Sequence, residues 1–163
     1  MERERLILSI NRFDHYFDSV NNKTAVYIAI NTFMLGSIIT GYFSIEEDII
    51  KNGNIFSILS ILTMVVGFGS ILLNTYASIP YFSQNSDSLY YFGGIGSIPL
   101  NEFCERSQNF TDEQDIQDLR NQVHTLSEGL NKKFRKLKLS GRLIMLQFVL
   151  IVPLVIIISL NTL

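Results

Sequence analysis

The chain has 163 residues, of which 47% are hydrophobic and 17% are charged, and its mean hydropathy of +0.25 is high for a soluble protein. The net charge of −2 is too small to indicate nucleic-acid binding by bulk electrostatics, and a single cysteine, Cys104, excludes an intrachain disulfide. Charged residues are crowded between long uncharged stretches, a distribution that a bilayer imposes because a charge in its centre is costly.

Residues 1–20 predict an amphipathic helix that leads into the first uncharged stretch. Its apolar positions recur at intervals of four and three residues, as one face of a helix requires. They are Leu6, Ile10, Phe13, Phe17 and Val20. This segment has no long apolar run and no small-residue cleavage site, so we expect no signal peptide. The helix could lie on the membrane surface, pack on other helices, or do both.

Three stretches approach the roughly 20 apolar residues that a helix needs to cross a bilayer. They are residues 24–45, residues 55–79 and residues 143–163. Pro80 marks the expected end of the second, and Pro153 inside the third is tolerated in a membrane helix. We therefore predict an all-α membrane protein with three transmembrane helices.

The distribution of Lys and Arg predicts the direction of the spans, since cytoplasmic loops are richer in both. Four basic residues precede the first span and eight lie between the second and third, whereas the loop between the first two holds only Lys51. We expect a cytoplasmic N-terminus and an external C-terminus. The predicted segments are a cytoplasmic helix (1–23), span 1 (24–45), an external loop (46–54), span 2 (55–79), a cytoplasmic helical region (80–142) and span 3 (143–163).

The region between spans 2 and 3 begins with a polar segment and a glycine cluster at 93–96, which predict a loop. A short helix from about residue 98 to residue 108 follows, with Pro99 in its first turn. Thr111 and Gln114 then form a capping box that opens a longer helix. Its apolar positions have a mean spacing of 3.5 residues, which is typical of a coiled-coil seam. They are Ile116, Leu119, Val123, Leu126, Leu130, Phe134 and Leu137.

No strong helix breaker separates this seam from the third span, because Gly141 alone costs only about 1 kcal/mol. We expect one long helix that continues from the cytoplasmic region into the last span. Its apolar stripe could pack on the N-terminal helix of the same chain, on other subunits, or on both.

The sequence contains no signature of an enzyme and no cluster with metal-ligand spacing, so we expect no catalytic residue, no metal site and no cofactor. Polar residues within the spans are more informative, because an amide in hydrocarbon needs a partner. Asn31, Asn74 and Gln147 are the leading candidates for lining a pore. The alternative is that they join helices by hydrogen bonds. Gly36, Gly41, Gly67 and Gly69 are positions where helices could approach closely or hinge.

A run of basic residues lies just before the third span. Lys132, Lys133, Arg135 and Lys136 belong to it. Such a run ordinarily sets topology and contacts anionic lipids. It could also hold the phosphates of a ligand whose base stacks on Tyr90 or Tyr91.

Several short signatures in this order resemble a known family. They are NNKTAVYIAIN entering the first span, LYYFGGIGSIPLNEF after the second, and DLRNQVHTLSEGLNKKFRKLKLSGRLIML entering the third. Together they are similar to small bacterial antiphage membrane effectors of the Pycsar type; a Hailong-type effector is also possible. Where the family commonly has a polar residue after the YFG turn, this chain has Gly94.

The resemblance implies an effector that senses a nucleotide product and compromises the bacterial inner membrane, which causes abortive infection. The companion nucleotidyltransferase or cyclase would supply a nucleotide second messenger or an oligonucleotide, and the sequence does not decide whether it opens or closes a pore. We expect a homo-oligomer, with a tetramer favoured, that forms an ion channel in the lipid bilayer and binds no duplex nucleic acid. The alternative is a non-conducting membrane anchor or adaptor that recruits a partner through its cytoplasmic helices.

Overall fold

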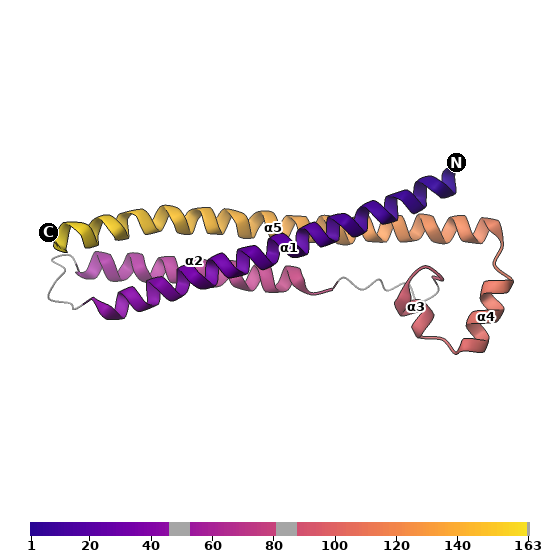
Figure 1. Ribbon diagram of the computed structural model, residues 1–163, viewed down its shortest axis with the longest axis horizontal. Helices are drawn as coiled ribbons and strands as arrows, with labels where there is room; N and C mark the ends of the chain where they lie inside the picture. The colour runs from indigo at the N-terminus through magenta and orange to yellow at the C-terminus, as the bar shows by residue number, and fades with distance from the viewer. Residues whose placement is uncertain (46–52, 81–87, 163) are drawn as a thin grey trace. The chain divides into compact units, whose positions relative to one another are not determined.

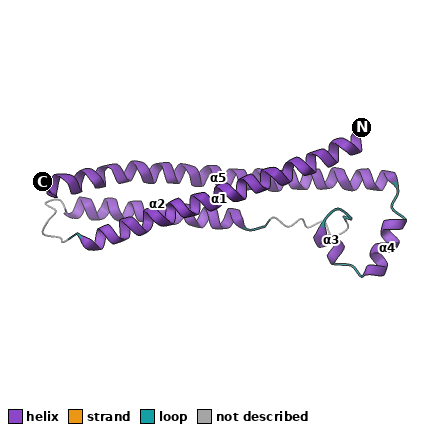
Figure 2. Ribbon diagram, in the orientation of Figure 1, coloured by secondary structure: helices purple, strands orange, loops and turns teal. Residues whose placement is uncertain are grey.

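The computed structural model describes residues 1–45, 53–80 and 88–162. Within this described part, all the regular structure is helical (Figure 2). The helices are α1 (Glu2–Ser44), α2 (Gly53–Ser78), α3 (Phe92–Gly96), α4 (Leu100–Gln108) and α5 (Asp112–Thr162) (Figure 1). The helices α1, α2 and α5 are long and apolar enough to cross a membrane. The prediction of an all-α protein with three membrane-spanning helices is therefore confirmed.

The topology relative to the membrane and the segment boundaries remain predictions. Most of the expected external loop (46–54) and the beginning of the region 80–142 lie outside the described residues. The first predicted span is the later part of α1, a 43-residue helix that also contains the expected amphipathic segment.

Helix α5 runs without interruption for 51 residues and includes Pro153. Its start is the predicted capping box: the amide of Gln114 donates to Thr111 Oγ1 at 3.3 Å, and the amide of Thr111 donates to Gln114 Oε1 at 3.0 Å. These bonds satisfy two backbone donors that a helix N-terminus leaves unpaired. The predicted single helix from the seam into the last span is thus present.

Two local predictions were wrong. The glycine cluster at 93–96 lies in the short helix α3 rather than in a loop, because the amide of Ile95 donates to the carbonyl of Tyr91 and Ser97 Oγ donates to the carbonyl of Gly94. Glycine permits turn conformations but does not require them. Pro99 is the N-cap of α4, with an extended ψ of 152°, and not part of its first turn.

The described residues form two compact units, each considered separately. The first unit comprises Met1–Val20 and Pro80–Phe134. In this unit α1 and α5 run parallel. Arg3 forms an ion pair with Asp115 near the starts of both helices, and the Phe17 ring faces the ammonium of Lys133 later in both. Val20 and Leu119 are completely buried there.

The second unit comprises Asn21–Ile79 and Arg135–Leu163. Here α2 runs antiparallel to α1, since Asn31 bonds Ser70 and Tyr42 stacks on Phe56. It is also antiparallel to α5, with Ser70 beside Ser140 and Phe56 packed with Leu154. Most large apolar side chains of this unit face outward, as lipid contact requires.

Candidate functional site

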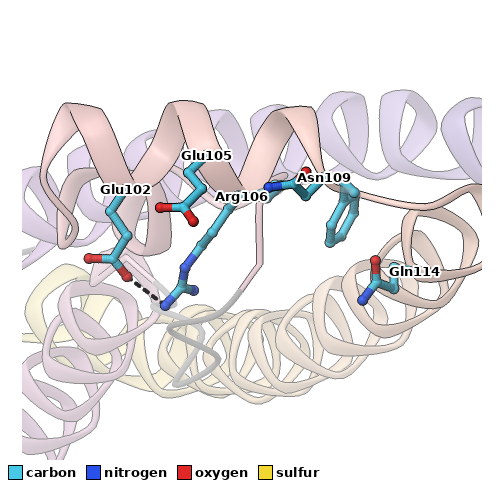
Figure 3. A pocket seen from close by; sticks show the side chains of 7 residues that line it. Glu102, Glu105, Arg106, Asn109 and Gln114 are labelled. Carbon is cyan, nitrogen blue, oxygen red and sulfur yellow. Dashed lines mark ion pairs between the residues drawn. The ribbon is translucent and has the colours of Figure 1, made fainter.

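A pocket of about 440 Å³ in the first unit is lined mainly by polar side chains (Figure 3). We call it the Arg106 pocket. It is lined by Leu89, Glu102, Glu105, Arg106, Asn109, Phe110 and Gln114. Helix α4 supplies the charged side chains, and Gln114 comes from the first turn of α5 (Figure 3). The volume lies within the range of roughly 300–1,000 Å³ that small-molecule sites occupy.

The charged groups of this pocket are one guanidinium and two carboxylates. Arg106 forms an ion pair with Glu102 at 2.7 Å, and both side chains remain 41% exposed. A guanidinium can bind a carboxylate or a phosphate through two parallel N–H donors. The oxygen of Gln114 is engaged in the capping box, so its amide nitrogen is the group left to donate. The lining therefore combines one cation, two carboxylates, two amide side chains and the ring of Phe110.

Two buried polar residues of α5 fix the chain where it enters this pocket. Asp118 is 7% exposed and accepts a 2.8 Å hydrogen bond from the amide of Leu89. Gln122 is 4% exposed and donates to Ser88 Oγ at 2.7 Å. The sequence analysis did not identify Asp118 or Gln122 as functional, because their partners are about thirty residues away in the chain. The sequence did contain one signal: Asp118 and Gln122 are four residues apart, so they lie on one face of the helix beside the seam.

Tyr90, a predicted ligand-stacking residue, is held on α5 by its hydroxyl group. It donates to Asp115 Oδ1 at 2.6 Å, and Arg3 Nε donates to the other oxygen of that carboxylate at 2.9 Å. Partial burial raises the pKa of Tyr90, and the hydrogen bond to Asp115 raises it further. The hydrogen bond to Tyr90, followed by the charge of Asp115, raises the pKa of Arg3. The other predicted tyrosine, Tyr91, packs against the ring of Phe92.

The basic run and the partner of Tyr90 lie far apart along α5, so the run and Tyr90 do not form one ligand site. Asp115, the partner of Tyr90, precedes Lys132 on α5 by between four and five turns, which is roughly 25 Å. Lys133 is 6% exposed, and its ammonium nitrogen lies 5.9 Å from the centre of the Phe17 ring. The ammonium nitrogen of Lys136 lies 3.6 Å from the centre of the Tyr76 ring. Lys132 and Arg135 are exposed. Lys133 and Lys136, two of the four predicted phosphate ligands, thus make cation–π contacts with aromatic rings.

Polar side chains fill the centre of the second unit, and we call them the amide core. Asn31, Asn74 and Gln147, the predicted pore-lining residues, are each 0% exposed and come from α1, α2 and α5. Asn31 Nδ2 donates to Ser70 Oγ at 3.0 Å, and Ser70 Oγ lies 2.9 Å from Ser140 Oγ. This layer therefore connects all three helices.

The hydrogen bonding of the amide core is incomplete. Among the described buried atoms, five lack a partner: Asn31 Oδ1 and both side-chain polar atoms of Asn74 and of Gln147. A buried polar group without a partner costs about 1–3 kcal/mol, and more where no water can reach it. The three predicted pore-lining residues are therefore buried inside the protomer in this conformation. Asn31 makes a side-chain hydrogen bond, whereas the amides of Asn74 and Gln147 make none.

The predicted seam is partly covered within the chain. Leu119, Leu130 and Leu137 are 0–7% exposed, whereas Phe134 is 37% exposed; Ile116, Val123 and Leu126 are intermediate. Helix α1 covers part of it, since Phe13 and Tyr16 line a groove together with Leu130 and Phe134. In the first unit the N-terminal helix therefore covers part of the stripe, and Phe134 stays partly exposed.

The chain was also compared with known proteins. A family model described as the Pycsar effector protein domain matches residues 5–160. No curated protein and no solved structure matches the chain. The matched range includes the Arg106 pocket, the seam and the amide core.

Proposed function

The chain belongs to the Pycsar effector protein family and is a membrane effector of antiphage defence, and from this premise we propose that it is a homo-oligomeric channel or pore controlled by a nucleotide-derived signal. One observation carries the proposal. Helix α5 supplies Gln114 to the Arg106 pocket and Gln147 to the amide core, so a single uninterrupted helix connects a ligand-sized pocket to a membrane-spanning segment. No enzymatic step is needed for such a function.

The chemistry of the Arg106 pocket favours a cyclic mononucleotide over an oligonucleotide. A cyclic phosphate carries one negative charge, which Arg106 can bind in two-point geometry by exchanging Glu102 for phosphate oxygens. Glu105 and the displaced Glu102 can accept hydrogen bonds from a ribose hydroxyl or a base amino group. Phe110 offers a ring for stacking. Several phosphates would be repelled by the two carboxylates.

A homo-oligomer is part of the proposal because three helices packed around their own side chains leave no room for an aqueous path. The first unit keeps large apolar side chains at its surface, which supports contacts between copies. Leu8 is 52% exposed, Tyr16 49% and Phe134 37%. We propose a tetramer in the bacterial inner membrane, with the first unit in the cytoplasm.

Ion flux into liposomes that contain the purified full-length chain tests the proposal. We expect one of the cyclic mononucleotides of cytidine, uridine, adenosine or guanosine to change the flux about tenfold, a usual size for allosteric coupling. Arg106→Met should remove this response and leave flux without nucleotide unchanged. Arg12→Met is the matched control, because Arg12 is exposed on α1 and is not part of the pocket.

Three results would count against the proposal. Flux that no nucleotide changes would contradict nucleotide control. A response retained by Arg106→Met would contradict the assignment of the pocket. An absence of flux in every condition, with insertion confirmed, would contradict the channel and favour the anchor or adaptor, which holds a partner at the membrane without conducting.

A further inference from the structure

The second unit has an inverted distribution of polarity compared with a soluble helical bundle. Its outer surface carries apolar side chains such as Phe33, Phe43 and Met145, which are 71–80% exposed. Its centre carries uncharged polar side chains at most 1% exposed. They are Thr24, Asn31, Ser60, Thr63, Ser70, Asn74, Ser140 and Gln147. Such a centre suits contact with water and ions better than it suits permanent burial.

Two groups of residues in this centre differ in their hydrogen bonding. Ser70 bonds both Asn31 and Ser140, and these bonds hold α1, α2 and α5 together. Asn74 and Gln147 have no partner for any side-chain nitrogen or oxygen. The first group stabilises the packed arrangement, and the second group destabilises it relative to any arrangement in which water reaches the amides.

The Gln147 amide lies close to the backbone of α2 in the packed state. A Cβ atom added at Gly67 would overlap the amide nitrogen of Gln147 and would lie 3.1 Å from Leu35. Gly36, Gly41 and Gly69 show no such close neighbour. The amide is therefore packed directly against the backbone of α2, and separation or rotation of the helices would give it access to hydrogen-bond partners.

On the basis of the channel function proposed above, we infer that Asn74 and Gln147 line the aqueous path of the conducting state, and that this structure is the closed state in which they are buried inside each protomer. Rearrangement of the three helices gives the amides water as a partner, while it breaks the layer of Asn31, Ser70 and Ser140. The path would carry water and small hydrated monovalent ions. Because the amide core has no ionisable side chain, it supplies no charged ring to select strongly by sign.

Apolar near-isosteres separate this role from a structural one. Gln147→Met and Asn74→Leu remove only unpaired groups, so we expect the melting temperature in detergent to stay equal or rise. We expect the same variants to lose about tenfold or more of the ion flux in the conducting condition, since a dry apolar constriction blocks ions. Thr32→Val is the control: Thr32 is an exposed polar residue on α1, and its removal should change neither quantity.

The outcomes distinguish this inference from the channel function itself. If wild-type protein gives no flux, the channel function fails. If wild-type protein conducts and Gln147→Met conducts equally, only the lining role is overturned. If Gln147→Met loses flux together with a clear drop in melting temperature, the amide joins the helices, and the lining role is again overturned.

A chemical measurement gives an independent result. Cys104 is the one cysteine of the chain and is exposed, so Cys104→Ser provides a background without thiols. In it, Gln147→Cys should react with a small, charged, membrane-impermeant methanethiosulfonate at least about tenfold faster when the channel conducts. Thr32→Cys should show no such difference. Equal rates at position 147 in both conditions would overturn the inference.

Discussion

Gln147 on α5 packs its side-chain amide against Gly67 on α2, at a point where even a methyl group would overlap it. Both amide atoms lack a hydrogen-bond partner. A long polar side chain in a membrane-spanning helix is thus held by packing rather than by hydrogen bonds. In this bundle the glycine provides the space that closes α2 onto α5.

Substitution of Gly67 tests this contact. Gly67→Ala should destabilise the closed packing, because the added methyl group overlaps Gln147, and overpacking of this kind costs about 1–3 kcal/mol. The melting temperature in detergent measures the effect, and Gln147→Ala in the same chain should restore part of it. Gly69→Ala is the matched control two residues away, where nothing lies within 4 Å. Equal effects at the two glycines would contradict the contact.

Asp118 should control the order of the segment that enters the Arg106 pocket. Asp118→Ala leaves the amide of Leu89 without its acceptor, and we expect hydrogen exchange of residues 88–92 to accelerate about fivefold to tenfold, as for a lost bond of about 1–1.5 kcal/mol. Asn121→Ala, on the exposed side of the same helix, should leave exchange there unchanged. Protection retained in Asp118→Ala would show that other contacts hold the segment.

Tyr90 gives the first unit a sensitivity to alkaline pH. Its pKa is raised in the folded chain, so the neutral phenol is favoured there, and its contribution to stability is complete below its ordinary pKa of about 10. That contribution is lost as pH rises through the raised pKa. The difference in phenolate absorbance between wild type and Tyr90→Phe should show a transition above the ordinary range. A transition at or below pH 10 would contradict the environment described for Tyr90.

The seam residues should separate folding of the protomer from assembly. Leu119 is 0% exposed, so Leu119→Ala should destabilise the protomer by about 2–5 kcal/mol, measured by thermal unfolding. Phe134 is 37% exposed, so Phe134→Ala should change protomer stability less and weaken the oligomer, measured by size in mild detergent. An unchanged oligomer with Phe134→Ala would place the subunit contacts elsewhere.

Local patterns predicted most of the fold. The uncharged stretches located the three spanning helices, and Thr111 with Gln114 located the start of α5, because both signals depend on neighbours within a few residues. The GGIG segment was predicted wrongly, since glycine favours turns, whereas here bonds to the carbonyls of Tyr91 and Gly94 close a short helix.

The candidate sites were less accessible from the sequence. Asn31, Asn74 and Gln147 stood out as amides in apolar stretches, but their burial depends on how three distant segments pack. Arg106, Asp118 and Gln122 did not stand out, because each is an ordinary polar residue in a polar helix until the segment at Leu89 lies beside it. The partners of the basic run were likewise invisible, since Phe17 and Tyr76 lie more than fifty residues before it.

The most direct test of the account is the membrane potential of bacteria that express the full-length chain, read with a voltage-sensitive dye while cyclic mononucleotides are supplied by a co-expressed cyclase. The account predicts that depolarisation changes when the cyclase is active, and that Gln147→Met abolishes depolarisation in cells that hold equal amounts of membrane-inserted protein. A membrane potential that stays normal with and without the cyclase, despite confirmed insertion of the wild-type chain, would contradict the channel and leave the anchor as the function of this effector.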